Sequence, residues 1–249
     1  GGRMSDAPGL LRDIEQAAVR GWPALESRPL DGWLWRHTSG GSIRANTVAA
    51  LAYTGADIEL SIDTIEGWYR ERGAPVAFTI SDVSMPADLD ARLDARGYRR
   101  GESHVTMAKR VDPDATLPEN VSVGVQPTNG WMEAYMSGLS EDRRGVAPKL
   151  IANLPRSAVF ISHDIGGVAG SSGLTVVDGR LASVQCMATL PQARRKGGAQ
   201  AVLGGIEAIA AQNRVEWLYL QTSHDNTAAR TLYARLGFEV VGHYHVRQK

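Results

Sequence analysis

The chain has 249 residues, a length that suits one large domain or two small ones, each with its own hydrophobic core. It carries 27 basic and 27 acidic residues, so no overall field attracts nucleic acid or an anionic membrane. We find neither an apolar run of about eighteen residues nor a signal-peptide pattern, and we expect a soluble cytoplasmic protein. Gly1–Arg3 precede Met4 and are interpreted as an expression scar.

Cys186 is the only cysteine. A single thiol excludes an internal disulfide and any zinc site built from several cysteines, and no metal is expected. Because Cys186 falls in an apolar predicted strand, we interpret it as a small core residue rather than a nucleophile.

The first half of the chain is predicted to alternate helices and strands. Its predicted elements are a helix over 10–25, strands over 32–36 and 43–50, a helix over 64–72, a strand over 76–80, a helix over 87–96 and a strand over 105–109. Residues 111–120, with two prolines and three acids, are predicted to be a linker.

Four of the six tryptophans lie in this first half, near Arg44 and Asn46. Aromatic walls with a few polar groups are typical of binding pockets, so this region could form an acceptor pocket. A tryptophan-rich core or a seam between domains is the alternative, and we favour it slightly.

The second half begins with a strand over 121–125 and helices over 129–139 and 142–153. Then follow strands over 158–162, 167–177 and 181–189, a helix over 198–213, a strand over 217–220, a helix over 227–236 and a strand over 239–246. This order predicts an α/β fold with a mixed sheet.

The two halves resemble one another. In each, an apolar strand is followed by an amphipathic helix that ends at a glycine and an aromatic residue, Gly97-Tyr98 and Gly237-Phe238. Strand–helix–strand units are common, but the register of the match favours duplication. The predicted domains are therefore an N-terminal copy over 4–110, a linker over 111–120 and a C-terminal copy over 121–249.

The most informative segment leaves a strand, turns through basic and glycine residues and enters a helix. Backbone N–H groups at a helix start are unpaired, and the helix dipole favours an anion there. Gly197 and Gly198 allow close approach of the backbone, while Arg194, Arg195 and Lys196 add positive charge. The segment predicts a pyrophosphate-binding loop, with a solvated basic turn as the alternative. It is neither a Walker loop nor a complete dinucleotide fingerprint.

Two motifs resemble the hallmarks of the GNAT (GCN5-related N-acetyltransferase) superfamily. The first is Arg194-x-x-Gly197-x-Ala199. The second is Asn226-x-x-Ala229-x-x-x-Tyr233-x-x-x-Gly237-Phe238. The resemblance is close over 158–247, weaker over 121–157, and reaches the first half only through the internal repeat. It implies an α/β (α+β) fold with a GNAT-like mixed sheet flanked by helices and, with the repeat, two such halves in tandem, the first without its own cofactor.

The resemblance also implies acetyl-CoA as co-substrate and a role for each matching residue. Tyr233 would be the catalytic acid that protonates the departing thiolate. Asn226 would hold the pantetheine arm or the loop beneath it. The remaining cofactor-binding residues would be Met187, Ala188 and Thr189, by their backbone, along the pantetheine, and Arg194, Arg195, Lys196, Gly197, Gly198 and Ala199 around the pyrophosphate.

The general base is left open. Many relatives place a glutamate on the central strand, but residues 182–189 contain no acid and no histidine. The alternatives are a water-relayed base, an amine with a low pKa, or one of several side chains, namely His163, Asp164, His224, Asp225, Glu133 and Tyr135.

We expect direct transfer of an acetyl group to a primary amine of a small molecule or an amino acid. The alternatives are a protein or peptide N-acetyltransferase, an acyl-CoA sensor without turnover, and a nucleotide-binding protein. No nucleic-acid or membrane partner is expected, and the protein is expected to be a monomer or a homodimer.

Overall fold

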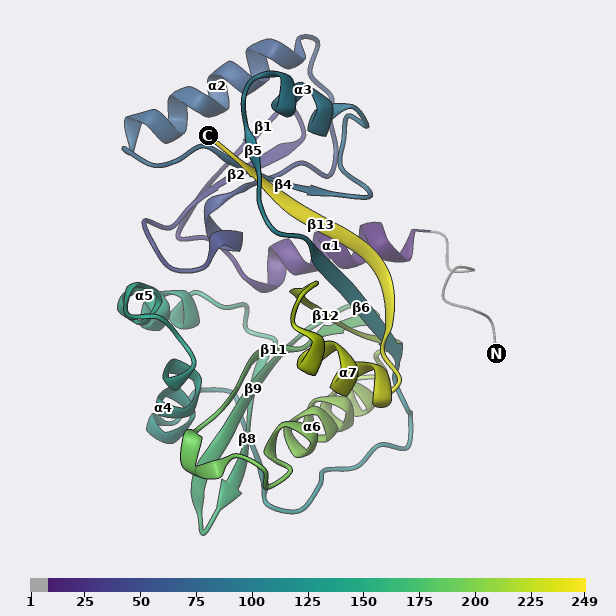
Figure 1. The fold of residues 1–249 in the computed structure, drawn as a ribbon. Helices are drawn as coiled ribbons and strands as arrows, with labels where there is room; N and C mark the ends of the chain where they lie inside the picture. The colour runs from purple at the N-terminus through teal and green to yellow at the C-terminus, as the bar shows by residue number, and fades with distance from the viewer. Residues whose placement is uncertain (1–8) are drawn as a thin grey trace. The chain divides into compact units, whose positions relative to one another are not determined.

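The computed structural model describes residues 9–249, so the interpretation of Gly1–Arg3 lies outside the described residues. The chain forms two compact units. Among the described residues, unit 1 comprises 9–107, Lys149–Asn153 and Gln221–Lys249, and unit 2 comprises Ala108–Pro148 and Leu154–Leu220. The chain passes between the units within strand β6 (His104–Arg110), helix α5 (Glu141–Ala152) and strand β12 (Trp217–Ser223), as can be followed in Figure 1.

Unit 1 contains a mixed sheet with the strand order β1-β2-β3-β4-β13, and β5 pairs with the far end of β13. Its strands are β1 (Glu26–Leu30), β2 (Trp33–His37), β3 (Val48–Ala49), β4 (Ala77–Ser81), β5 (Arg99–Arg100) and β13 (Glu239–Gln248). Strands β3 and β4 are parallel, and the other pairs are antiparallel. The last strand therefore lies beside β4, from Tyr244 opposite Ser81 to Gln248 opposite Ala77.

Unit 1 has an aromatic core on which helices α2 and α3 pack. The helices of this unit are α1 (Leu10–Gly21), α2 (Ile58–Glu71), α3 (Leu89–Ala95) and α7 (Thr227–Arg235). Trp33 and Trp35 are at most 1% exposed and pack with the buried face of α2, which includes Ile62, Ile65 and Tyr69. The interpretation of the tryptophans as a core is thereby confirmed for these two residues.

Unit 2 contains the strand order β12-β10-β9-β8-β7, with β11 also paired to β9. Its own strands are β7 (Val121–Gly124), β8 (Ala158–Ile165), β9 (Val168–Asp178), β10 (Leu181–Ser183) and β11 (Gln185–Thr189). Helices α4 (Asn129–Ser137) and α6 (Gly198–Gln212) pack against β8 and β9 (Figure 1). Trp131 of α4 donates from Nε1 to the carbonyl oxygens of Ile161 and Gly173, which fastens α4 to both strands.

Several element boundaries differ from the prediction. The predicted strand over 43–50 is a 3₁₀ helix, η2 (Ile43–Asn46), followed by the short β3. The Asn46 side chain accepts from the Thr38 N–H and donates to the carbonyls of Gly40 and Ser42, and such local bonds compete with strand pairing. Helix α2 begins at Ile58 rather than near 64, because Asp57 caps it.

The broader prediction, an α/β (α+β) fold with a mixed sheet flanked by helices, is confirmed. Strands β1 and β5 were not predicted; β1 contains Pro29 and lies at the edge of the unit 1 sheet, where a strand proline is tolerated. Residues 111–120 contain no helix or strand. The division into duplicated copies is a statement about ancestry and stays a prediction. Among the described helices, none combines the length and apolarity needed to cross a membrane.

Candidate functional site

The predicted pyrophosphate-binding loop leaves β11 through a short 3₁₀ helix, η3 (Pro191–Ala193). Arg195 and Gly197 have φ values of 63° and 73°, and these two left-handed residues turn the chain into α6. The side chains of Arg194, Arg195 and Lys196 are exposed, and none of the three forms an ion pair within residues 9–249. Their positive charge is therefore available to a ligand.

The start of α6 has no side-chain cap. Gly197 occupies the N-cap position and makes no capping hydrogen bond, so the first-turn N–H groups lack a side-chain partner. Helix α2 of unit 1 differs, because the carboxylate of Asp57 accepts from the N–H groups of Glu59 and Leu60. An acid at that place occupies the position that an anionic ligand would take.

The surroundings of position 198 favour glycine over any residue with a Cβ atom. A Cβ atom on this residue would lie 2.1 Å from Ser171 Oγ and 3.1 Å from Ser171 Cβ. Ser171 Oγ is 2.9 Å from Thr189 Oγ1, with either hydroxyl able to donate. Two of the predicted cofactor-binding residues, Gly198 and Thr189, are thus brought together by Ser171, a residue that the motifs do not include.

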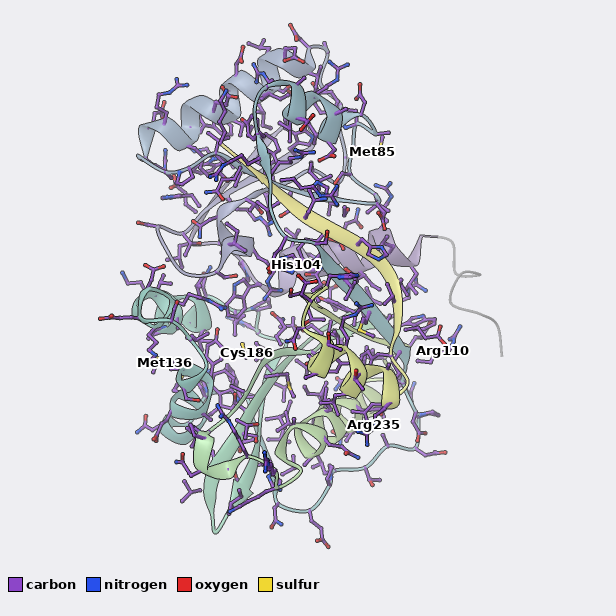
Figure 2. All side chains as sticks on the ribbon, in the orientation of Figure 1. Met85, His104, Arg110, Met136, Cys186 and Arg235 are labelled. Carbon is purple, nitrogen blue, oxygen red and sulfur yellow. The ribbon has the colours of Figure 1, made fainter. Side chains whose placement is uncertain are left out.

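The strand predicted over 181–189 is divided at Val184. Strand β10 pairs with β9 and, in parallel, with β12, whereas β11 pairs with β9. The register shifts between Gln185 and Ala188, and Cys186 has a φ of 55°, which marks a bulge. Cys186 is labelled in Figure 2. The bulge changes the course of the strand just before Met187, Ala188 and Thr189, the residues predicted to hold the pantetheine.

Tyr233 and Asn226 belong to unit 1, on α7 and at its N-cap. The Tyr233 ring meets Phe238 edge-on, with 5.8 Å between the ring centroids. Burial raises the pKa of the Tyr233 hydroxyl, which keeps it protonated at neutral pH, and no described residue forms a hydrogen bond with it. Asn226 Oδ1 accepts from the Ala229 N–H at 3.2 Å, so its oxygen caps the helix.

His163 stands apart from the other base candidates. It is half-buried on β8, and its Nδ1 is buried without a hydrogen-bond partner in the described part of the chain. The same atom is 3.4 Å from the place that a Cβ on Gly198 would take, at the start of α6. Its neighbour Asp164 accepts hydrogen bonds from the hydroxyls of Ser122 and Ser162.

The remaining base candidates have structural or solvent-exposed settings. His224 Nδ1 lies 3.3 Å from Asp225 Oδ1 in an exposed turn. Glu133 is exposed, and Tyr135 is buried against Trp131 with 5.3 Å between ring centroids. Across residues 9–249, no group of three or more His, Cys, Asp or Glu side chains could hold a metal ion.

A cluster of charged residues in unit 1 was only partly predicted. Glu15, Arg36 and Arg44 line one cavity, and the first two are each 5% exposed. Arg44 was named from the sequence as part of a possible acceptor pocket, but Glu15 was not singled out. The sequence did contain a signal for Glu15, because it is four residues from Leu11 and three from Ala18 on the apolar face of α1. The place of Arg36 in the cavity has no local signal, since it depends on the pairing of β2.

A family model described as "Probable histone acetyltransferase Rv0428c C-terminal" matches residues 9–248. The chain is 26% identical over 248 residues to the "Uncharacterized N-acetyltransferase YobR" of Bacillus subtilis (strain 168), covering 96% of this chain and 98% of that protein. A GCN5-related N-acetyltransferase from Kribbella flavida superposes with a TM-score of 0.68 at 17% identity, covering 97% and 96%. A tandem GNAT protein from the clavulanic acid biosynthesis pathway gives 0.64 at 13% identity, covering 100% and 90%.

The identities to the two solved structures are low, so these likenesses show the fold, which is that of the GNAT superfamily. The family model, by contrast, is a match of sequence and spans nearly every described residue. The predicted superfamily is thereby confirmed, and the chain belongs to the acetyltransferase family that is named for the C-terminal part of Rv0428c.

Proposed function

We propose that this chain is an acetyl-CoA-dependent N-acetyltransferase that acts on a primary amine of a small molecule or an amino acid. The observation that carries the proposal is the start of α6. There an uncapped helix N-terminus follows three exposed cations, and Gly198 sits where a side chain cannot fit. Such a start favours a phosphate-bearing ligand.

The residues present suit the cofactor. Arg194, Arg195 and Lys196 would neutralise the pyrophosphate, and the N–H groups of Gly197, Gly198 and Ala199 would donate to it. Met187, Ala188 and Thr189 would hold the pantetheine by their backbone, and Asn226 would support the loop beneath it. When bound, acetyl-CoA supplies an activated acetyl group as a thioester.

Only one cofactor site is proposed. The Asp57 carboxylate already accepts from the first N–H groups of α2, and its charge would repel a phosphate there. This difference between the two helix starts supports the interpretation of the first half as a GNAT-like copy that does not bind its own cofactor.

Tyr233 is proposed to supply the proton that the leaving thiolate takes up. Its hydroxyl stays protonated at neutral pH because burial raises its pKa. An amine attacks only in its neutral form, so a proton must also leave the acceptor. Strand β11 has no acid or histidine for this task, and His163 is the candidate whose ring nitrogen lacks a protein partner.

Thermal unfolding with and without acetyl-CoA tests the proposal. At a concentration of about one hundred times Kd, a ligand stabilises the native state by roughly 2.7 kcal/mol. An Arg194→Ala variant should need about tenfold more acetyl-CoA, because a charge-assisted hydrogen bond contributes roughly 1.5–3 kcal/mol. Arg156→Ala, an exposed arginine elsewhere in unit 2, is the matched control. No stabilisation of the parent protein would contradict the proposal.

A protein acceptor is the second candidate, because the family description names a probable histone acetyltransferase. Release of the CoA thiol, measured with a lysine-rich peptide and with small amines at equal amine concentration, separates the two. A peptide that reacts with a kcat/KM at least tenfold above that of every small amine would favour the second candidate.

A further inference from the structure

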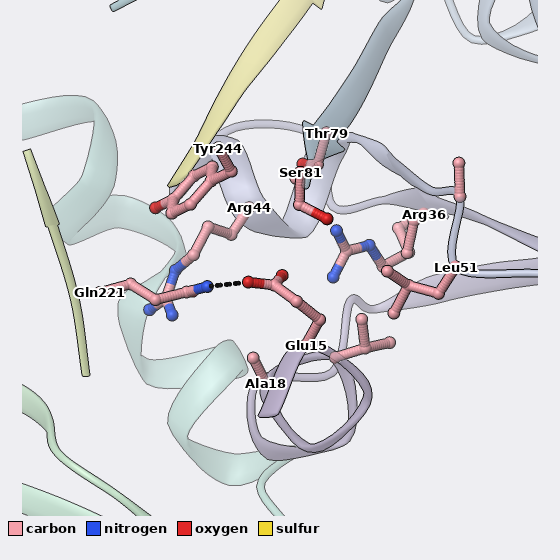
Figure 3. A pocket seen from close by; sticks show the side chains of 12 residues that line it. Glu15, Ala18, Arg36, Arg44, Leu51, Thr79, Ser81, Gln221 and Tyr244 are labelled. Carbon is pink, nitrogen blue, oxygen red and sulfur yellow. Dashed lines mark hydrogen bonds between the residues drawn. The ribbon is translucent and has the colours of Figure 1, made fainter. Parts of the chain in front are cut away.

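Unit 1 contains a polar cavity that the motifs do not explain. Its volume is about 30 Å³, and its lining includes Glu15 of α1, Arg36 of β2, Arg44 of η2, Gln221 of β12 and Tyr244 of β13. Figure 3 shows the side chains of Glu15, Arg36 and Gln221 directed toward one another from three different elements, with the hydrogen bond between Gln221 and Glu15 dashed. Such a volume accommodates about two water molecules, which is also about the size of one carboxylate group.

Arg36 is a buried cation without a carboxylate partner. It is 5% exposed, and its Nε and Nη2 donate to the carbonyl and the hydroxyl of Thr47, at 2.9 and 3.0 Å. No carboxylate oxygen of the described residues lies within 4.0 Å of its guanidinium. Glu15 in the same wall interacts with this guanidinium electrostatically but forms no ion pair with it. A guanidinium stays charged in proteins, and burying it without a paired counterion is costly. The cavity therefore favours an anion.

Arg44 adds a second cation to the same cavity. It is half-buried, its guanidinium lies 5.6 Å from the centre of the Trp22 ring, and it forms no ion pair within residues 9–249. Stacking on Trp22 holds the guanidinium in place with its N–H groups unused by any carboxylate. Two such guanidinium groups match the planar shape of a carboxylate, which each of them can bind through paired hydrogen bonds.

The setting of Glu15 and the cavity volume determine which anion fits. Glu15 Oε1 accepts from Thr106 Oγ1 and Gln221 Nε2, both at 3.2 Å, which orients its carboxyl without pairing it to either arginine. Burial raises the pKa of this carboxyl to about 7, so it carries little of the negative charge that would balance the arginines. The two guanidinium groups and the volume of about 30 Å³ therefore suit a small, singly charged carboxylate.

We propose that this cavity binds the carboxylate of the acceptor, with Arg36 and Arg44 as its ligands, so that the acceptor is an amino acid or a small amine bearing a carboxylate. The proposal rests on the proposed function, since it names the substrate class of the same reaction. Arg36 and Arg44 are specificity-determining residues in this scheme. The amine of the acceptor extends out of the cavity, whose volume holds the carboxylate alone.

The test compares each of the twenty common amino acids, and ornithine, with the amine that its decarboxylation would give, for example lysine with cadaverine. Release of the CoA thiol gives kcat and KM, and thermal unfolding without cofactor gives binding of the acceptor by itself. We expect at least one amino acid to exceed its matched amine by about tenfold or more in kcat/KM and to raise the unfolding temperature alone.

The variant Arg44→Gln identifies the site. It should raise the KM for that amino acid about tenfold or more and abolish the stabilisation by the amino acid. Arg70→Gln, an exposed arginine on α2, is the control and should behave as the parent protein does. Equal reaction of acids and amines, a preference for phosphoethanolamine, or an unaffected Arg44→Gln variant would overturn the proposal. Stabilisation by acetyl-CoA is measured separately, so its absence would count against the proposed function alone.

Discussion

Glu15 should make the stability of unit 1 depend on pH. Burial is the largest cause that raises the pKa of its carboxyl, from 4.5 to about 7, and the hydrogen bonds from Thr106 and Gln221 and the charge of Arg36 oppose the rise only in part. The charge of Asp82 adds to the rise. Between these two pKa values the unfolded chain has released the proton and the native state still holds it. Stability therefore falls as the pH rises through this range.

The magnitude follows from the two pKa values. One pKa unit corresponds to about 1.4 kcal/mol, so raising the pH from 5 to 8 should lower the free energy of unfolding by about 2–3 kcal/mol through Glu15 alone. A Glu15→Gln variant keeps an oxygen that accepts from Thr106 and Gln221 but has no proton to release. Its stability relative to the parent protein should therefore improve by about 2–3 kcal/mol over the same pH interval.

Urea denaturation at pH 5 and pH 8, followed by tryptophan fluorescence, measures this difference. Four of the six tryptophans lie in unit 1, so the signal reports mainly on that unit. Glu71→Gln is the matched control, because the Glu71 side chain is 65% exposed. The reasoning is refuted if the Glu15→Gln variant and the parent protein lose the same stability between the two pH values.

Four further substitutions have defined outcomes. Tyr233→Phe should lower kcat by about 10²–10⁴ at unchanged acetyl-CoA affinity, since it removes the proposed acid; unchanged turnover in a thiol-release assay would remove Tyr233 from the mechanism. Gly198→Ala should cost about 1–3 kcal/mol in urea denaturation because of overpacking, whereas Gly67→Ala, whose Cβ meets nothing within 4 Å, should stabilise by about 0.4–1 kcal/mol. Asp90→Asn should lower the free energy of unfolding by about 1–2 kcal/mol at pH 7, because it removes the charge that pairs with Arg247. This figure is already reduced for the partial exposure of Asp90. A loss below about 0.5 kcal/mol would show that solvent screens the pair.

The cofactor loop could be predicted from the sequence because its determinants are local. The turn, the cations and the glycines from Arg194 to Ala199 follow one another along the chain, and the strand and helix around them have clear periodicity. The reason for a glycine at position 198 could not be read from the sequence. A side chain there would meet Ser171, which is on a neighbouring strand and outside both motifs.

Of the polar cavity in unit 1, the sequence indicated only Arg44, because the lining residues meet through tertiary pairing. Glu15, Arg36, Arg44, Gln221 and Tyr244 come from elements spread over almost the whole chain. The local sequence pattern also predicted a strand where η2 forms, because hydrogen bonds of the Asn46 side chain favour the 3₁₀ helix over strand pairing. A single sequence gives no register between distant strands, and the place of β13 beside β4 was therefore not predicted.

The pairing of β13 with β4 has a consequence for the order in which the protein folds during synthesis. His245 of β13 and Asp90 at the start of α3 are hydrogen-bonded although 155 positions separate them along the chain. A ribosome adding about 5–20 residues per second needs roughly eight to thirty seconds to synthesise that stretch. Throughout this interval β4 presents an unpaired edge, which is open to pairing with another chain. Nascent unit 1 is thus the part of the molecule that we expect to depend most on protection by chaperones.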